Sequence, residues 1–370
     1  MSTLDVLCSR RRPGLTVAAL AGLVATAACG RIGFDAIDNL GSWFDRAWTY
    51  RKPLVIDHTK VAGDLVDFPV QVELADSDLA RAQASGADLV FVDARGQVLA
   101  HELELFAPGP VQLLAWVKLP AVSAATDTTF YLYYGNPAAA DQQQVATVWS
   151  GYAAVYHFTS GALVREATGA NPGINQGATT ATGKILDAAS FTGGANLIAP
   201  ANGVDAAPGA LTTVTFWLYY HLPYGQAAFA FLDEAGRGYD LWMEADGCFG
   251  FNTENGDVLG TAALGQPKPV ERWVHVAAAF YNGVPDAAHN QLYLDGVAQP
   301  LASCTGGTPQ ARQASGALYW ASGNGYQLDG LLDEGRIYPG VRSPAWIRTE
   351  YLNQSDAGAF ITAGPEEQVP

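Results

Sequence analysis

Apolar and polar residues alternate with a period of two along much of the chain. Val70, Val72 and Leu74 alternate with polar neighbours, as expected for a half-buried antiparallel strand. Glycine, proline, aspartate and serine fill the connections, and no long helical period is found there. The pattern predicts an all-β fold. The strands predicted in the first half span residues 51–56, 67–74, 87–92, 97–105, 112–119 and 128–134.

A second series of strand-like runs follows, with its best defined members at residues 272–281, 291–294 and 328–338. Asp295-Gly296 predicts a two-residue hairpin turn, because both residues tolerate positive φ. Ser343-Pro344 predicts the N-cap and first turn of a short helix over 345–352. We interpret this helix as a packing element.

The composition is that of a folded globular protein. The 370 residues are 49% hydrophobic and only 15% charged, and the length allows two domains. Forty glycines agree with many turns. The formal net charge of −16 disfavours nucleic acids and anionic lipid surfaces as partners.

Residues 1–29 are typical of an export signal. Three arginines (Arg10 to Arg12) precede an apolar segment that is too short to span a bilayer and ends in small residues. Thr26-Ala-Ala-Cys29 is similar to a bacterial lipobox, in which Cys29 receives the lipid, although Thr26 stands where an aliphatic residue is usual. Ala25-Thr-Ala27 would also suit ordinary signal peptidase and a secreted product, which is the less favoured alternative. Residues 30–47 follow as a tether.

The remaining cysteines, Cys248 and Cys304, are an even number in an oxidising compartment. They predict a disulfide, and two separate buried thiols are the alternative. With both cysteines bridged, a Cys/His zinc site is disfavoured.

Several short motifs in residues 48–150 follow one another in the order found in a known family. They are Trp48-Thr-Tyr-Arg-Lys-Pro53, Asp67-Phe-Pro69, Gly86-Ala-Asp-Leu-Val-Phe91, Ala115-Trp-Val117 and Tyr131-Leu-Tyr-Tyr-Gly-Asn136. This region resembles the DUF2341 family, which implies a β-sandwich and no particular chemistry. The run from Val148 to His157 resembles the junction that this family makes with a LamG-like domain.

Residues 152–364 resemble that LamG-like jelly roll of the concanavalin A-like lectin/glucanase superfamily. The matching blocks are 190–194, 211–217, 272–296 and 328–338. The fold prediction is therefore two tandem β-sandwiches, the second a LamG-like jelly roll with a short C-terminal helix, followed by a frayed tail at 365–370.

The superfamily also includes retaining glucanases, which need two neighbouring carboxylates. Glu244-Ala-Asp246 provides the first two acids of their motif, but Phe249 occupies the position of the second catalytic Glu. His101-Glu102 lacks the second histidine of a zinc-protease helix. We expect His157 and His275 to be hydrogen-bonded structural residues. The sequence thus predicts no catalytic residue.

Sugar binding is the favoured function, because aromatic rings stack on the apolar faces of sugars. Alternation places Trp217 and Tyr219, with Thr215 and His221, on the less apolar face of one strand. It places Trp242 between Asp240 and Glu244 on the less apolar face of another. The alternative is that Trp217 belongs to ordinary sheet packing and that a loop covers Trp242.

The resemblance implies a structural Ca²⁺ ion as a possible cofactor. Asp333 matches the late ligand position of LamG-like domains, and Glu166 stands near the early position, where Asp is usual. The alternative is that Asp333 and Glu334 bond locally or pair with Arg336 or Arg342.

Together these features predict an exported, lipid-anchored outer-membrane or cell-surface protein, or alternatively a periplasmic or secreted one. The expected role is non-catalytic recognition of an envelope or matrix glycan, or of a surface protein. The runner-up is a structural or protein-interaction module without sugar binding, and a glycoside hydrolase ranks third.

Overall fold

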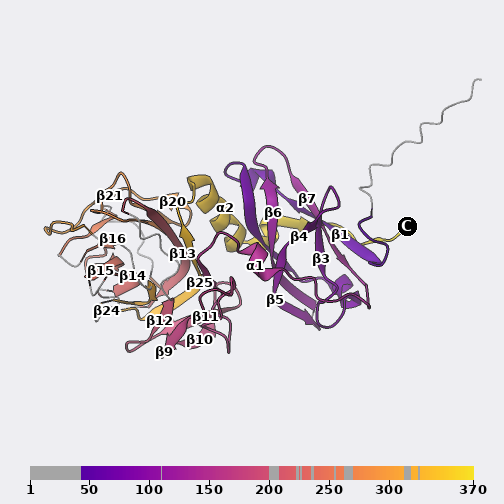
Figure 1. Ribbon diagram of the computed structural model, residues 1–370, viewed down its shortest axis with the longest axis horizontal. Coiled ribbons are helices and arrows are strands. Elements are labelled where there is room, and N and C mark those ends of the chain that lie inside the picture. Colours follow the sequence, from indigo (N-terminus) through magenta and orange to yellow (C-terminus); the bar gives the residue numbers. More distant parts are fainter. Residues whose placement is uncertain are drawn as a thin grey trace, which may run out of the picture. The chain divides into compact units, whose positions relative to one another are not determined.

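The computed structural model describes residues 43–109, 111–199, 208–221, 225, 227–234, 237–253, 256–261, 270–311, 318–323 and 326–370. The predicted signal, Cys29 and most of the tether lie outside these residues. Two β-sandwiches follow one another along the described chain (Figure 1). Within the described residues, no helix combines the length and hydrophobicity needed to cross a bilayer.

The first sandwich packs a larger sheet A against a smaller sheet B. Sheet A has the order β26-β1-β7-β3-β4, with β27 also pairing β1, and sheet B has the order β2-β6-β5. The strands of sheet A are β1 (Tyr50–Ile56), β3 (Val90–Asp93), β4 (Val98–Leu99), β7 (Thr128–Tyr134), β26 (Ile361–Ala363) and β27 (Glu367–Gln368). Those of sheet B are β2 (Leu65–Leu74), β5 (His101–Pro108) and β6 (Val111–Val122). Phe91 and Phe130 from sheet A meet Phe68 and Val70 from sheet B in one buried core.

The C-terminal strands belong to this first sandwich. β26 pairs antiparallel with β1, with Ile361 opposite Ile56, and β27 pairs with the start of the same strand. Figure 1 shows these yellow strands beside the indigo β1. Arg51 also pairs with Glu367 at 2.6 Å. The predicted frayed tail is therefore wrong, because its backbone completes the edge of sheet A, and residues 361–363 lie outside the second sandwich.

The second sandwich contains two large sheets. Sheet C has the order β10-β11-β25-β13-β18-β19-β20, with β8 also on β25, and sheet D has the order β21-β17-β16-β15-β14-β22-β12-β9. Sheet C contains β8 (Ala154–Tyr156), β10 (Thr179–Thr182), β11 (Asp187–Phe191), β13 (Leu211–Tyr220), β18 (Trp273–Tyr281), β19 (Gln291–Leu294), β20 (Val297–Ala298) and β25 (Gly330–Pro339). Sheet D contains β9 (Ile174–Gln176), β12 (Asn196–Ala199), β14 (Ala227–Glu234), β15 (Arg237–Met243), β16 (Phe249–Asn252), β17 (Leu259–Thr261), β21 (Leu301–Ser303) and β22 (Leu318–Trp320). A small pair, β23 (Ser322–Gly323) and β24 (Tyr326–Gln327), lies beside them.

Two local predictions for the second sandwich are confirmed. Asp295 and Gly296 have φ of 50° and 71° and close the β19–β20 hairpin. Cys248 and Cys304 form a disulfide. In the chain-entropy description, a loop of this length contributes about 4 kcal/mol of stability.

Short helices connect and cover the sheets. They are η1 (His58–Lys60), η2 (Ser77–Arg81), α1 (Val145–Val148), α2 (Pro344–Ser355) and α3 (Ala357–Phe360). In α2, the Ser343 side chain accepts a hydrogen bond from Trp346 N and Pro344 occupies the first turn, as predicted. Figure 1 shows α2 between the two sandwiches. Its Asn353 bonds both backbone groups of Gln71 on β2, while Gln354 bonds Trp217 on β13.

Candidate functional site

The outer face of sheet C carries the row of side chains that alternation predicts. Val214, Phe216 and Leu218 of β13 point into the core between sheets C and D. Trp217 and Tyr219 lie on the opposite face. On the neighbouring β18, the same alternation places Trp273 on that outer face, directly opposite Tyr219.

Helix α2 covers one part of this outer face. Trp217 is 2% exposed, and its indole Nε1 donates a hydrogen bond of 2.7 Å to Gln354. Thr215 donates to Glu350 of the same helix at 3.1 Å. Trp217 therefore offers no free ring face to a sugar, which corrects its predicted role. The packing alternative holds for this residue because α2 shields it.

The uncovered part of the face holds partly exposed aromatic rings. Tyr219 and Trp273 meet edge to face with centroids 5.6 Å apart, and His221 continues the row beyond Tyr219. The Tyr219 hydroxyl donates to Glu271 at 3.1 Å, which holds the ring in place. Of the residues predicted to bind a ligand, Tyr219 is thus on an accessible aromatic surface.

Beside these rings lies a depression of about 310 Å³, which we call the aromatic hollow. It is lined by Lys184, Trp217, Arg272, Trp273, Asp295, Tyr351 and Ser355. Arg272 donates to Asp295 at 2.9 Å, and Lys184 donates to the Ser355 carbonyl at 2.9 Å. The hollow therefore combines partly exposed aromatic surface with charged donors and acceptors fixed at its rim. Such a mixture suits a ligand that has both apolar faces and hydroxyl groups.

The second predicted platform, around Trp242, is covered. Trp242 is 5% exposed, and the ring of Tyr326 lies against it with centroids 4.6 Å apart. The disulfide Cys248–Cys304 belongs to the same cluster. Asp240 is fully buried and Glu244 is half-buried. Trp242, Asp240 and Glu244 therefore do not form an open platform, because other elements pack over the strand face.

The residues proposed for calcium have other partners. The Glu166 carboxylate accepts hydrogen bonds from the backbone N–H groups of residues 155, 168, 170 and 171 and from the Thr168 hydroxyl. Asp333 accepts from the N–H groups of Ile185 and Glu334 at 2.8 Å each. The two carboxylates share no metal-binding group among the described residues. They do not fit the predicted calcium site, and the alternative pairing is found instead, with Glu334 2.7 Å from Arg336.

A buried charged network fills the junction between the sandwiches. His157 stacks on Trp116 with an interplanar angle of 17° and also contacts Trp149. Its ring nitrogens lie 2.7 Å from Glu334 and 3.2 Å from Glu102. Burial opposes the charged imidazolium, but Glu334, Glu104 and Glu102 together raise the His157 pKa well above its usual range. The hydrogen bonds expected of His157 are found, whereas Nε2 of His275 lies 3.7 Å from Glu350, beyond hydrogen-bond distance.

A β-bulge helps to build this network. Opposite the single residue Phe216, β25 carries two residues, Glu334 and Gly335, so the register shifts by one residue between Thr215 and Trp217. Glu334 has a φ of 52°, and Gly335 turns toward the core, where a Cβ would meet Phe158 and Trp320 at 3.0 Å. The bulge thereby directs Glu334 into the junction. A position with such a close approach requires glycine.

Arg336 and Glu104 complete the network. Arg336 pairs with Glu334 and, at 3.3 Å, with Glu350, and it lies over the rings of Trp116 and Trp149. Oxygens of Glu104 and Glu334 and a nitrogen of His157 lie within 4.8 Å of one another. The Glu104 and Glu334 side chains are only 2% and 1% exposed, so this carboxylate pair cannot flank a glycosidic bond.

Sequence reasoning missed Trp273, Arg272 and Asp295. All three occur within sequence runs that identify the fold. The alternation of core and outward-facing residues in the first of these runs also indicates that Trp273 faces outward. Alternation along 273–281 separates the core residues Val274 and Val276 from Trp273, which faces outward with Tyr219.

The fold defines a concanavalin A-like sandwich that follows a smaller β-sandwich. Residues 191–348 match the family described as the concanavalin A-like lectin/glucanases superfamily (Laminin G type 3). Residues 85–161 match a domain of unknown function, DUF2341. The chain therefore carries a DUF2341 domain followed by a concanavalin A-like domain, in the order that the motifs predict.

A comparison with curated protein sequences finds no match. Among solved structures, domain 4 of an extracellular arabinanase from Geobacillus stearothermophilus, in complex with arabinotriose, is 19% identical. The match covers 54% of this chain and 98% of that domain, with a TM-score of 0.40. The binding domain of botulinum neurotoxin serotype D is 14% identical. The match covers 55% of this chain and 51% of that domain, with a TM-score of 0.37.

A sialidase of Trypanosoma rangeli, in complex with 2,3-difluorosialic acid, is 15% identical. That match covers 70% of this chain and 43% of the sialidase, with a TM-score of 0.41. This chain thus spans about half or less of the neurotoxin domain and of the sialidase.

Proposed function

We propose that the protein is a non-catalytic carbohydrate-binding protein and that a sugar ring stacks in the aromatic hollow. The observation that carries this proposal is the partly exposed Trp273 ring beside the Arg272–Asp295 pair. Trp273 provides an apolar surface for the C–H face of a sugar, while Arg272 and Asp295 offer a donor and an acceptor to its hydroxyls. The concanavalin A-like fold is compatible with this role.

The absence of catalysis is part of the proposal. The charged lining of the hollow is an Arg–Asp pair and a lysine, and Asp295 is tied to Arg272 and to the backbone of His275. A glycosidase needs an acid and a second carboxylate on either side of the scissile bond. Among the residues that line the hollow, Asp295 is the single carboxylate.

The same proposal covers the setting of the protein. We place the binding domains outside the cytoplasm, on an outer membrane or cell surface, held by a lipid on Cys29, with an envelope or matrix glycan as the ligand. Replacing Cys29 by Ser and following the membrane fraction and the lipid label tests the anchor. If the protein with Cys29 intact carries no lipid, the proposed anchor is wrong.

Glycan-array binding of Trp273→Ala tests the site. We expect the variant to lose about ten-fold or more in affinity, because truncating a central aromatic anchor costs at least about 1.4 kcal/mol. Tyr326→Ala is the matched control, since Tyr326 is an exposed aromatic residue that covers Trp242. Loss of binding only in Tyr326→Ala would move the site to the Trp242 surface. A folded protein that binds nothing on the array would favour a structural or protein-interaction role.

A further inference from the structure

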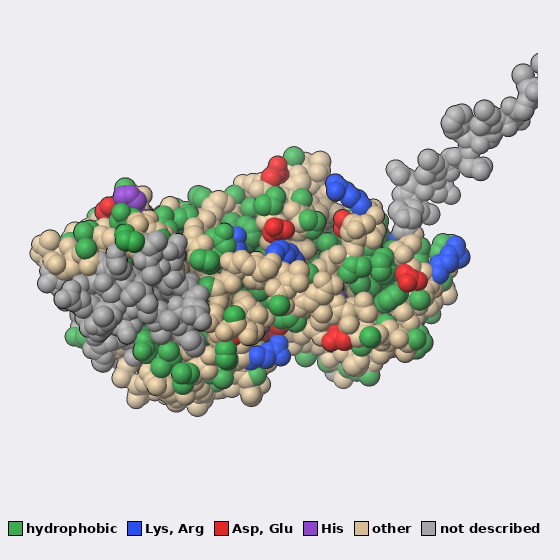
Figure 2. All heavy atoms as spheres, viewed as in Figure 1, with side chains coloured by type: hydrophobic (Ala, Val, Ile, Leu, Met, Phe, Trp, Pro, Cys, Tyr) green, Lys and Arg blue, Asp and Glu red, His purple; other side chains and the backbone are tan. Residues whose placement is uncertain are grey.

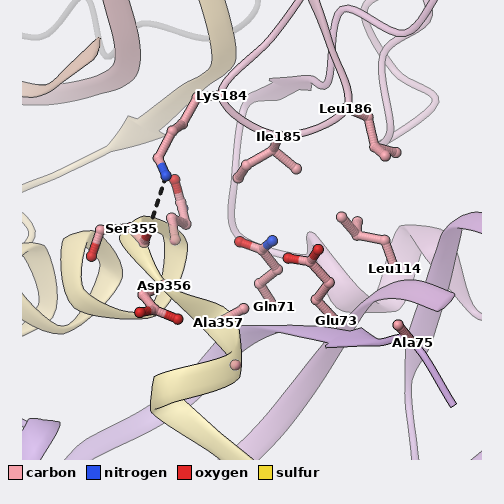
Figure 3. A pocket seen from close by; sticks show the side chains of 12 residues that line it. Gln71, Glu73, Ala75, Leu114, Lys184, Ile185, Leu186, Ser355, Asp356 and Ala357 are labelled. Carbon is pink, nitrogen blue, oxygen red and sulfur yellow. Dashed lines mark hydrogen bonds between the residues drawn. The ribbon is translucent and has the colours of Figure 1, made fainter. Parts of the chain in front are cut away.

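A second depression, of about 410 Å³, lies where the two sandwiches meet (Figure 3). We call it the junction cleft. It is lined by Gln71, Glu73, Ala75 and Leu114 of the first sandwich, by Lys184, Ile185 and Leu186 of the second, and by residues 354–358 at the end of α2 and the start of α3. Figure 3 shows Gln71 and Glu73 side by side on β2, pointing toward the loop that carries Ile185 and Leu186.

Gln71 is an unusual residue to find in such a place. It is 2% exposed, yet its side-chain oxygen has no hydrogen-bond partner among the described residues. Its backbone is held on both sides, because Asn353 accepts from its N–H at 2.7 Å and donates to its carbonyl at 3.0 Å. A buried amide without a partner is destabilising. Gln71 is therefore a fixed polar group that a ligand in the cleft would satisfy.

The junction cleft and the aromatic hollow adjoin each other. Lys184 and Ser355 line both of them, and their hydrogen bond lies at the boundary. Gln354 lines the cleft and at the same time holds the indole of Trp217, which lines the hollow. The two depressions, each within the usual size range of ligand sites, can thus receive neighbouring parts of one ligand.

The lining of the cleft indicates an uncharged, hydroxyl-rich ligand. Glu73 and Asp356 are exposed carboxylates that can accept hydrogen bonds from hydroxyl groups, and the half-buried Leu186 provides apolar surface. One cation, Lys184, faces these two carboxylates in the lining. On the face drawn in Figure 2, Lys and Arg side chains lie singly rather than in a patch. With a net charge of −16, the protein disfavours a polyanionic chain.

We propose that the aromatic hollow and the junction cleft form one groove that binds a neutral oligosaccharide long enough to cross the junction. The first sandwich contributes Gln71 and Glu73 of β2 to this groove, which gives that sandwich a direct part in recognition. The inference rests on the proposed sugar-binding function, and it adds the length of the ligand and the second half of its site.

The experiment is calorimetric titration of the full chain with neutral oligosaccharides of one to six units, in gluco, xylo, arabino, manno and galacto series. We expect the affinity to rise with length in the series that binds. Gln71→Met keeps the shape of the side chain and removes the amide. It should bind the shortest sugars as the unaltered protein does and lose several-fold in affinity for the longer ones. Gln112→Met, at an exposed glutamine that lines neither depression, should match the unaltered protein.

The outcomes separate the two proposals. Binding that depends on Trp273 but neither increases with length nor responds to Gln71→Met would overturn the groove and leave the hollow as the site. An equal loss at every length in Gln71→Met would also overturn it. No binding of any sugar would overturn both proposals. Glu73→Gln, at an exposed position, repeats the test if Gln71→Met fails to fold.

Discussion

The junction between the two sandwiches has a closed part and an open part, which meet at Leu114 and Ile185. In the closed part, His157, Arg336 and their carboxylate partners lie among tryptophan rings, and every member has a bonding partner. In the open part, the Gln71 side-chain oxygen has no partner among the described residues. Leu114 and Ile185 pack against the closed part and also line the junction cleft.

This difference separates a role in stability from a role in binding. Charges are removed from water at a high cost, which ion pairs and hydrogen bonds offset in the closed part. The open part leaves the Gln71 amide oxygen unsatisfied and leaves the carboxylates of Glu73 and Asp356 exposed. If the junction only held the two domains together, we would expect the polar side chains of the open part to be paired as they are in the closed part.

Arg336→Met should give the largest loss of stability. The substitution keeps the apolar part of the side chain but leaves Glu334 and Glu350 as buried charges without their shared cation. Breaking a buried pair in this way costs about 3–5 kcal/mol. Urea unfolding, followed by tryptophan fluorescence and circular dichroism, measures the change.

Arg165→Met is the matched control. Arg165 reaches the same network, 3.1 Å from Glu102, but its side chain is 62% exposed. An exposed pair is worth about 0–1 kcal/mol. If the two variants lose equal stability, the distinction between the closed network and the surface is wrong.

Ile361→Ala should have the next largest effect. Ile361 is 4% exposed, lies opposite Ile56 in sheet A and packs into the core of the first sandwich. Truncating a buried isoleucine costs about 2–4 kcal/mol. The neighbouring Thr362→Ala, at an exposed position of the same strand, should change the unfolding free energy by no more than about 0.5 kcal/mol. A negligible effect of Ile361→Ala would mean that the C-terminal strand is not part of the folded core.

The return of this strand illustrates what a local pattern cannot show. β26 has three residues, and it is stabilised by a partner strand near residue 55 rather than by its own sequence. The predicted strand at 128–134 coincides with β7, because there the period of two and the turn residues around it are local. The order and the type of the two sandwiches were predictable from such local strand patterns and from the family resemblance.

The binding residues show the same limit. Alternation correctly separates the two faces of β13 and β15, but it does not reveal what covers each outer face. Trp217 is covered by α2, more than a hundred residues later, and Trp242 by Tyr326. Gln71 and Glu73 carry no signal of their own, since the cleft exists only where a second domain meets β2.

The smallest effect is a change in pH dependence caused by Glu104→Gln. Burial, with Glu334 and Glu102 nearby, raises the pKa of Glu104 to about 7. Its unfolded pKa is near 4.5, so between these values the folded protein binds the additional proton. The stabilising contribution of the protonated form is therefore complete below pH 4.5 and is lost as the pH rises through about 7.

Glutamine imitates the protonated carboxyl and does not titrate. We expect Glu104→Gln to match the unaltered protein near pH 4.5 and to become progressively more stable than it up to about pH 7, by at most about 1.4 kcal/mol per pH unit. Urea midpoints at several pH values measure this difference. A difference between Glu104→Gln and the unaltered protein that stays constant with pH would mean that Glu104 is ionised in the folded state.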